Sequence, residues 1–445
     1  MLRYKEENKM TKININLSEK VKPMKPMHGG GQPPMALQFD YVDTYHFTHM
    51  HYLTEIGVPY SRLHDVGGPF GAGKYVDIPN IFRDFDADEN DPASYDFAFT
   101  DFLLENLVNA GVEPYYRLGV TIENQCLIKK YFTYPPKDYA KWARICEHII
   151  MHYNEGWADG YHFGITYWEI WNEPDLARGE LWAGTDEEYF RLYEVASKHL
   201  KKRFGDSIKV GGYGSVGFYA IAPDKNNTPP NDDQIEKITF FEGFMEYIKK
   251  TNAPIDFFSW HTYATPDRIV TADNWLDNKL KEYGYEGLET HINEWNPRFG
   301  DNLGTANHAA EATATMLAMQ CGHPQVMCIY DMRSTGRWAA FFDVRTSKPI
   351  QTYYGFAAFN KLYQLGTQVK HTCDTEDIYA VCASDGKKGA LLISNVSGED
   401  QELIIEGIDL TNARYSVIDE TRMLSWAPNA DVIENDMVVL IEFDC

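Results

Sequence analysis

The sequence predicts an α/β protein in which a (β/α)8 TIM barrel is followed by a smaller all-β sandwich domain. Between residues 19 and 365, strand-like and helix-like segments alternate eight times, which is the order that a parallel barrel requires. After about residue 366 the helices stop and short strand-like segments follow one another. The chain has 445 residues, whereas such a barrel typically uses roughly 250, so there is room for a second domain.

The elements of the barrel follow from hydrophobic periodicity and from the glycines, prolines and asparagines that interrupt it. The expected strands are 23–28, 58–64, 112–118, 164–173, 207–213, 255–263, 287–294 and 325–331. The expected helices are 41–57, 95–111, 138–155, 185–204, 235–251, 272–284, 306–321 and 352–365. Because each strand is followed by a helix, we expect parallel strands joined by right-handed crossovers.

The second domain is expected to include both ends of the chain. Its own segment, 366–445, contains five short strand-like runs, with a hairpin signal at Asp385-Gly386. These runs are 377–384, 389–395, 401–406, 413–418 and 437–443. About 80 residues are few for an independent sandwich, and residues 12–17 alternate with period two, so we expect 10–18 to contribute a strand.

The composition excludes several classes of partner. The chain carries 41 Lys and Arg against 65 Asp and Glu, a net charge of −24, which disfavours nucleic acid and anionic membranes. No apolar run approaches the roughly 18 residues of a membrane span, and the first residues are charged where a secretory signal would be apolar, so we expect a cytoplasmic protein. The 7 cysteines are scattered without a C-x-x-C pair, which favours reduced thiols. Whether the chain forms a homo-oligomer is left open.

Two segments each bring a glutamate to the end of a predicted strand. Residues 167–175, Tyr-Trp-Glu-Ile-Trp-Asn-Glu-Pro-Asp, stop at a proline directly after Glu173. Residues 288–297, Leu-Glu-Thr-His-Ile-Asn-Glu-Trp-Asn-Pro, place Glu294 in the same way. Because the carboxyl ends of barrel strands meet at one catalytic mouth, we expect Glu173 and Glu294 to form a pair. Glu169 is expected to lie deeper in the barrel, paired with a basic residue.

Three other patterns resemble nucleotide-binding or metal-binding motifs but lack a feature that each site needs, so neither a cofactor nor a metal is expected. Residues 68–75 have the spacing of a phosphate-binding loop, but Tyr75 replaces the Ser or Thr that would bind magnesium. Residues 212–217 fit G-x-G-x-x-G, but prolines from Pro223 onward interrupt the helix that a dinucleotide site needs. Three histidines within residues 46–51 do not share one face of their predicted helix, so they cannot bind one metal together.

Four motifs together resemble glycoside hydrolase family 39 of clan A, the β-xylosidase and α-L-iduronidase family. Trp-Asn-Glu-Pro at 171–174 and Asn-Glu-Trp-Asn at 293–296 are similar to that clan's acid/base and nucleophile motifs. Arg-Leu-His at 62–64 and Ser-Trp-His-Thr-Tyr at 259–263 are similar to the family's second-strand and sixth-strand motifs. The resemblance implies a barrel with a β-sandwich built from both chain ends, which agrees with the domain layout expected above.

The resemblance also implies a mechanism. Glu294 would attack the anomeric carbon and Glu173 would act as acid and then base, in a retaining double displacement. The charge of Glu294 would raise the pKa of Glu173 and keep it protonated, while donors such as the Tyr263 hydroxyl would keep Glu294 ionised. Expected substrate-binding residues at the mouth are His64, Asn172, His261, Tyr263 and Trp295.

The substrate is expected to be a short, neutral glycoside of the xyloside type, because a strongly acidic chain disfavours polyanionic sugars. Another clan A activity, such as that of an arabinosidase or a β-glucosidase, remains an alternative. A non-catalytic carbohydrate-binding protein is an alternative of a different class. The presence of both glutamates argues against that second alternative.

Overall fold

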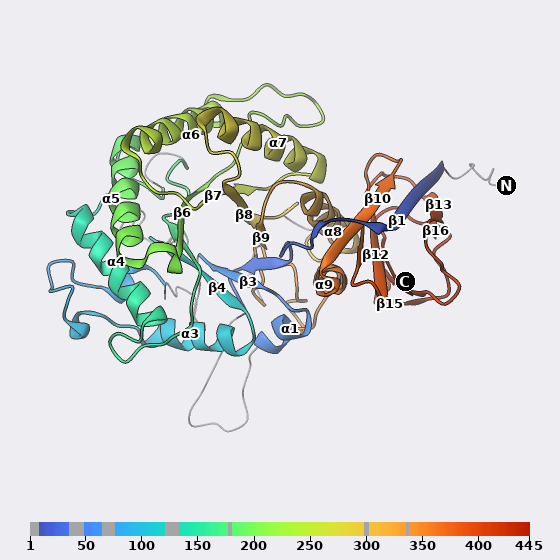
Figure 1. The fold of residues 1–445 in the computed structure, drawn as a ribbon, viewed down its shortest axis with the longest axis horizontal. Helices are drawn as coiled ribbons and strands as arrows, with labels where there is room; N and C mark the ends of the chain where they lie inside the picture. The colour runs from blue at the N-terminus through green and yellow to red at the C-terminus, as the bar shows by residue number, and fades with distance from the viewer. Residues whose placement is uncertain are drawn as a thin grey trace.

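A computed structural model describes residues 9–34, 49–64, 76–120, 133–176, 180–297, 302–334 and 338–445. Within these residues, eight parallel strands close into a barrel in the order β2-β3-β4-β5-β6-β7-β8-β9. Nine further strands form one sheet, which lies beside the barrel next to helices α8 and α9 (Figure 1). The predicted fold class, a TIM barrel with a C-terminal β domain, is confirmed.

The barrel strands are short and their side chains are almost all buried, as expected for a parallel sheet that is surrounded by helices. They are β2 Gly29–Gly31, β3 Tyr60–Leu63, β4 Glu113–Leu118, β5 Tyr167–Ile170, β6 Lys209–Ser215, β7 Phe257–Thr262, β8 Glu289–Trp295 and β9 Val326–Ile329. Because the strands are parallel, their carboxyl ends all lie at one mouth of the barrel, where the loops that follow them can carry functional side chains.

Most helices around the barrel begin and end within about three residues of the predicted bounds, but the helix predicted at 272–284 begins at Pro266 and the short helix Ile78–Ile81 was not predicted. The helices are α1 Met50–Glu55, α2 Ile78–Ile81, α3 Ala98–Asn109, α4 Tyr139–Asn154, α5 Asp186–Phe204, α6 Asp232–Thr251, α7 Pro266–Tyr283, α8 Ala306–Cys321 and α9 Gln351–Leu365. Local capping explains the agreement. A capping box of Thr185 and Glu188 opens α5, and Gly284 in a left-handed conformation (φ 89°) closes α7.

The β domain uses both ends of the chain, as predicted. β1, Lys9–Pro23, lies between β10 and β13, antiparallel to the first and parallel to the second. The sheet order is β15-β14-β17-β12-β11-β10-β1-β13-β16. The other strands are β10 Thr367–Cys373, β11 Ile378–Ser384, β12 Lys388–Asn395, β13 Gln401–Glu406, β14 Arg414–Ile418, β15 Met423–Ala427, β16 Val432–Ile433 and β17 Val438–Asp444. A separate cluster of buried apolar side chains, including Ile13 and Leu391, forms the core of this domain.

Three expectations about the elements need correction. The first barrel strand is Gly29–Gly31, not 23–28, because the period-two segment at the N-terminus continues to Pro23 within the β domain. The fourth barrel strand ends at Ile170, three residues before Glu173. The sequence also did not predict β10, β15 and β16. The start of the predicted helix 41–57 lies outside the described residues, and its described part contains α1.

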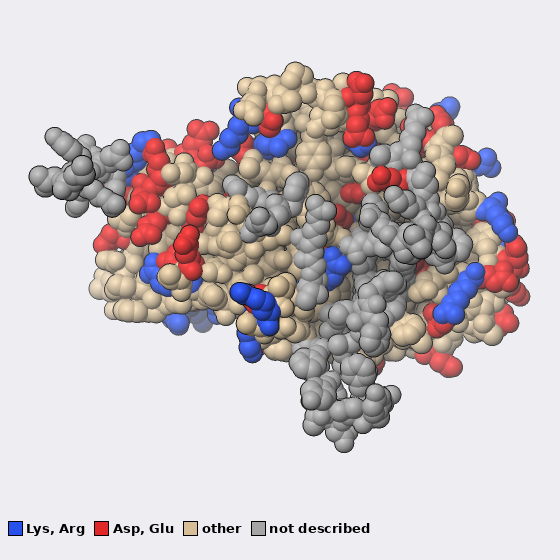
Figure 2. Space-filling model, turned by 180° about the vertical axis from the view of Figure 1, so that it is seen from behind, with Lys and Arg blue, Asp and Glu red and all other residues tan. Residues whose placement is uncertain are grey.

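Two properties of the surface bear on partners. No helix among the described residues is long and apolar enough to cross a membrane. On the face shown in Figure 2, acidic side chains form patches near both ends of the molecule, with basic side chains scattered among them. This distribution agrees with the net charge of −24.

Candidate active site

Glu173 lies in the loop after β5, in a backbone conformation that non-glycine residues rarely adopt. Its φ is 44°, and that of Trp171 is 74°. Two backbone hydrogen bonds hold this loop: Trp171 N donates to Leu118 O (2.7 Å) and Glu173 N donates to Gly214 O (3.0 Å). The loop is therefore fixed to the strands on both sides of β5, which over-determines the unusual backbone.

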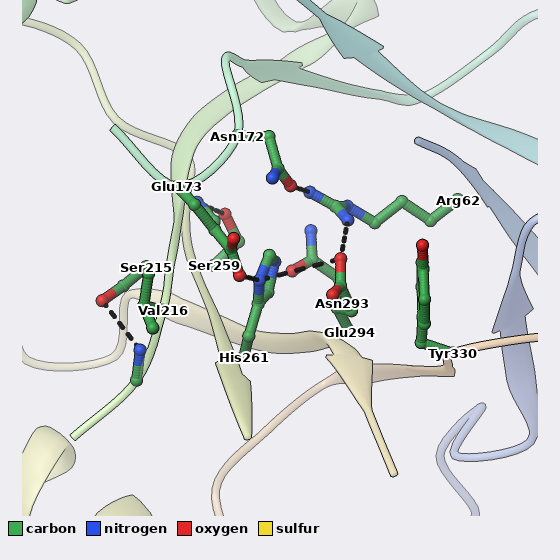
Figure 3. Close-up of polar contacts among 12 residues, drawn as sticks. Arg62, Asn172, Glu173, Ser215, Val216, Ser259, His261, Asn293, Glu294 and Tyr330 are labelled. Atoms are coloured by element: carbon green, nitrogen blue, oxygen red, sulfur yellow. Dashed lines mark hydrogen bonds and ion pairs between the residues drawn. The ribbon is translucent and has the colours of Figure 1, made fainter. Parts of the chain in front are cut away.

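Glu294 lies within β8 and is only 7% exposed. Its carboxylate accepts two hydrogen bonds, from the Tyr263 hydroxyl (2.7 Å, to Oε1) and from Arg62 Nη1 (3.0 Å, to Oε2). Figure 3 shows Arg62 and His261 on two sides of this carboxylate. The hydrogen bonds from Tyr263 and Arg62 both favour the charged form of Glu294, which is the form a nucleophile needs.

The two predicted glutamates are neighbours, and His261 lies between them. One carboxylate oxygen of Glu173, one of Glu294 and a ring nitrogen of His261 all lie within 4.8 Å of one another. His261 Nδ1 is 2.6 Å from Glu173 Oε1 and 3.8 Å from Glu294 Oε2 (Figure 3). The shorter contact requires a proton on one of its two atoms, so Glu173 and His261 share a proton directly beside Glu294.

Arg62 connects the pair to the interior of the barrel. Its guanidinium donates to Glu169 Oε2 (2.8 Å from Nε, 2.7 Å from Nη2) and to Asn172 Oδ1 (2.5 Å), in addition to Glu294. Both Arg62 and Glu169 are buried, which confirms that Glu169 is paired with a basic residue deeper in the barrel. Ser259 and Asn293 also donate to Glu169 Oε1, at 2.6 and 2.7 Å. The carboxylate of Glu169 is thus fully occupied in orienting Arg62.

Burial and charge set the protonation of this site. Burial and the nearby Glu173 raise the pKa of Glu294 to about 7, against the opposing effects of His261, Arg62 and Tyr263. Burial lowers the pKa of His261 to about 4, so the imidazole is neutral near neutral pH. Burial would also raise the pKa of Glu169, but the charges of Arg62 and His261 together with the hydrogen bonds from Ser259 and Asn293 outweigh it, and the pKa lies below its usual value. Near neutral pH the charge of Arg62 is therefore balanced by Glu169, whereas the raised pKa of Glu294 opposes a second negative charge at the site.

Most of the predicted binding residues also lie at the mouth. Asn172 is fully buried, and its side-chain nitrogen has no hydrogen-bond partner among the described residues, although its oxygen is held by Arg62. Tyr263 contacts Glu294, and its own backbone N–H donates to the Tyr219 hydroxyl (2.8 Å). His64 is buried directly after β3, two residues beyond Arg62.

Trp295 does not join this group. Its indole is fully buried and stacks on Phe356 of α9, with ring centroids 6.3 Å apart. Neighbouring residues in a strand point to opposite faces, so the residue after Glu294 faces the surrounding helices. Trp260 of β7 is equally buried and packs near Phe218.

Sequence reasoning missed two residues at the mouth. Arg62 was noticed only as part of a motif, although a basic residue two positions before a strand-end histidine was a usable signal. Trp338 lies beyond β9, with its ring centroid 5.1 Å from that of Tyr263, and is half-buried. No periodic pattern marks Trp338, because it lies after β9 and outside the regular strands and helices.

The donors of Glu173, His261 and Glu294 are also close enough to bind a metal ion. Two contacts oppose this interpretation. Glu173 and His261 already bond directly at 2.6 Å, and Arg62 places a positive charge 3.0 Å from Glu294. The group therefore fits a proton-sharing acid pair better than it fits a cation site.

Comparison with known proteins identifies the family to which the sequence is similar. Residues 11–309 match the sequence profile described as Glycosyl hydrolases family 39. A β-xylosidase of Caldicellulosiruptor saccharolyticus is 29% identical over 230 residues, covering 49% of this chain and 39% of the relative. A β-xylosidase of Geobacillus stearothermophilus is 26% identical over 274 residues, covering 59% of this chain and 45% of the relative. The matched segments thus span less than half of the length of either relative.

Solved structures share the whole fold at low sequence identity. A glucosidase from Croceicoccus marinus has a TM-score of 0.76 at 19% identity, covering 98% of this chain and 99% of that one. A monomeric β-xylosidase from Caulobacter crescentus CB15 has a TM-score of 0.66 at 16% identity, covering 97% and 99%. At such identities these structures support the fold alone.

Proposed function

The chain belongs to family 39 of the glycosyl hydrolases, and on this premise we propose that it is a retaining glycosidase that cleaves a short, neutral glycoside of the xyloside type. The names of the matched relatives support the xyloside as the first substrate to test. The proposal assigns Glu294 as the nucleophile and Glu173 as the acid/base.

One observation carries the proposal: the side-chain oxygens of Glu173 and Glu294 approach within 4.8 Å. Retaining glycosidases hold their two carboxyl groups about 5–5.5 Å apart, whereas inverting enzymes need about 6.5–9.5 Å to admit a water molecule. The close approach leaves no room for that water and supports direct attack by one carboxylate on the sugar.

The surroundings of the two glutamates support their different roles. Glu294 accepts from Arg62 and Tyr263, which stabilise a charged nucleophile. Glu173 contacts the neutral imidazole of His261, so that the two can pass a proton between them. In the first step Glu294 attacks the anomeric carbon while Glu173 protonates the departing oxygen. In the second step Glu173 takes a proton from a water molecule whose oxygen attacks the anomeric carbon, and the bond between the sugar and Glu294 breaks.

Several neighbours would bind the sugar. The buried nitrogen of Asn172 has no hydrogen-bond partner in the part of the chain that the structure describes, and we assign it to a ring hydroxyl next to the anomeric carbon. Trp338 and Tyr263 form an aromatic wall that fits the apolar face of a pyranose ring. His64 completes the set on the side of β3, and Trp295 is omitted because it faces the helices.

The basic residues near the mouth favour a neutral sugar. A uronic acid would need a free cation, and the guanidinium of Arg333 is already held by Asp331 through two contacts of 3.0 and 2.7 Å to Oδ2. Arg298 and Arg337, which could also bind a carboxylate, lie outside the described residues. Arg62 is committed to Glu169 and Glu294.

The test is hydrolysis of a panel of aryl glycosides: β-D-xyloside, β-D-glucoside, α-L-arabinofuranoside and α-L-iduronide. We expect the xyloside to be cleaved fastest, with the product of the same anomeric configuration appearing first in a proton NMR time course. Glu294→Gln should abolish this turnover, whereas Glu286→Gln, at an exposed turn, should leave it unchanged. Fastest cleavage of another sugar would replace the substrate, inversion would refute the mechanism, and sugar binding without turnover would indicate a binding protein.

A further inference from the structure

We propose that Gln32 is a further substrate-binding residue, whose side-chain oxygen accepts a hydrogen bond from a sugar hydroxyl remote from the scissile bond. Gln32 directly follows β2, so it lies at the carboxyl-end mouth of the barrel, where the functional side chains meet. The inference rests on the proposed glycosidase function, because it assigns Gln32 to the sugar of that reaction.

The backbone of Gln32 has a conformation that glutamine rarely adopts. Its φ is 46°, which lies in the left-handed region. Its backbone N–H donates to the carbonyl oxygen of Arg62 (3.2 Å), so the residue is fixed against β3. Non-glycine residues that are held in this region by their neighbours concentrate at functional sites. The backbone of Gln32 therefore gives a first indication that the direction of its side chain matters.

The side chain of Gln32 is buried, but only one end of its amide is used. Gln32 is 1% exposed, and its Nε2 donates to the Tyr330 hydroxyl (2.5 Å). The amide oxygen Oε1 has no hydrogen-bond partner among the described residues. An unpaired buried carbonyl oxygen is unfavourable, so it calls for a donor that the chain itself does not supply. A sugar hydroxyl at the barrel mouth is a donor of this kind.

Tyr330 connects the amide of Gln32 to the nucleophile. Tyr330 follows β9, the strand that lies between β8 and β2 in the barrel. Its backbone N–H donates to the carbonyl oxygen of Trp295, the residue after Glu294 (2.8 Å). Figure 3 shows the ring of Tyr330 beside Glu294 and below Arg62. The amide of Gln32 thus belongs to the same mouth as the catalytic pair.

The order of the strands indicates which hydroxyl Gln32 meets. In the closed barrel β2 is opposite β6, which is flanked by β5 and β7, the strands of Glu173 and His261. Because Glu173 protonates the departing oxygen, the leaving group lies on the side of β5 to β7, and the far end of the sugar ring points towards β2. Gln32 then meets the hydroxyl on C3 or C4, whereas Asn172 serves the hydroxyl next to the anomeric carbon. Xylose and glucose have the same configuration at C3 and C4, so Gln32 accepts both sugars.

The experiment compares kcat/KM of the wild type and Gln32→Leu on an aryl glycoside and on its 2-deoxy, 3-deoxy and 4-deoxy analogues, made for the sugar that the wild type cleaves fastest. Leucine keeps the size of the side chain and removes the acceptor. We expect a loss of about 5–20-fold on the parent glycoside. On the 3-deoxy or the 4-deoxy analogue the loss should shrink to within about twofold, because that substrate lacks the donor. On the 2-deoxy analogue it should persist.

Controls separate a contact with the sugar from a structural role. Gln364→Leu, at an exposed position of α9, is the matched control and should leave all four rates unchanged. A loss of the same size on all four substrates would mean that Gln32 acts only through the fold or through Tyr330, and would overturn the proposal. A loss that disappears on the 2-deoxy analogue alone would overturn the assignment to C3 or C4.

A second variant keeps the test decisive if Gln32→Leu does not fold. Asparagine tolerates a left-handed φ, and its side chain is one methylene shorter, so Gln32→Asn should fold and show the same dependence on the deoxy analogues. An equal loss for Gln32→Asn on every analogue would count against the inference in the same way. If the wild type cleaves no glycoside at all, the proposed function fails first, and the inference fails with it.

Discussion

Removal of the hydrogen bond between Tyr263 and Glu294 should shift the acid limb of catalysis to higher pH. In Tyr263→Phe, Glu294 loses a donor at 2.7 Å that stabilises only its charged form. Hydrogen bonds to charged groups contribute about 1.5–3 kcal/mol, and about 1.36 kcal/mol corresponds to one pKa unit. The pKa of Glu294, about 7 in the intact site, should therefore rise by about 1–2 units. Burial keeps the pKa of the Tyr263 hydroxyl well above its ordinary value, so it remains a donor throughout the assay.

The measurement is kcat/KM against pH with a dinitrophenyl glycoside, whose leaving group needs no proton, so the acid limb reports on the nucleophile. Activity should rise with pH through the pKa of Glu294, near 7 in the wild type and about 1–2 units higher in the variant. Tyr353→Phe, which removes a hydroxyl bonded to Tyr52 O (3.1 Å), is the matched control and should leave the limb in place. An unshifted limb in Tyr263→Phe would mean that this hydrogen bond does not set the charge of Glu294.

Three further predictions follow from the same contacts. Glu173→Ala should still form the covalent intermediate from dinitrophenyl glycosides but hydrolyse it slowly, so a burst of dinitrophenol should precede slow turnover, and azide should accelerate that turnover. The absence of a burst would contradict the role of Glu173 as acid/base. Arg62→Met should lose about 3–5 kcal/mol of unfolding free energy in urea titrations, because it leaves Glu169 buried and unpaired, and adding Glu169→Gln should recover part of the loss. Since the pKa of Glu294 is raised to about 7, the wild type should lose stability as the pH rises from about 4.5 to 7, by up to about 3 kcal/mol. Glu294→Gln should not lose it, and parallel melting curves of the two proteins across this range would argue against the raised pKa.

The sequence was most informative where a local rule decides the structure. The alternation of strands and helices predicted the barrel, and the period-two pattern near the N-terminus predicted a strand in the β domain. The tight β2, Gly29–Gly31, could not be predicted, because three glycines carry no hydrophobic pattern and are held by pairing with β3 and β9. The continuation of β1 to Pro23 likewise depends on its pairing with β10, which lies more than 340 residues away in the chain.

The site shows the same division. The inward direction of Glu294 depends on an irregularity in β8 at Asn293, and that of Glu173 depends on a loop with positive φ angles that is tied to β4 and β6. Propensity alone extends the strand through Glu173, because Trp and Ile favour extended backbone. For Trp295, aromatic character suggested a role in sugar binding, but its side chain packs outward on Phe356. Strict alternation would place Trp295 on the same face as His291 and Asn293, so the irregularity of β8 at Asn293 decides its outward direction.

The balance of charge at the mouth explains why one arginine has to serve three acceptors. Arg62 brings one positive charge to a buried region that contains Glu169, Glu173 and Glu294, and His261 is neutral. If Glu169 neutralises Arg62, the remaining pair can hold a single negative charge at low cost only by retaining one proton. Double displacement needs this state, with one carboxylate charged and the other protonated. Burial raises the pKa of Glu294 to about 7 and so opposes its ionisation beside Glu173. The hydrogen bonds from Arg62 and Tyr263 lower that pKa, and they therefore act in the direction that a charged nucleophile needs.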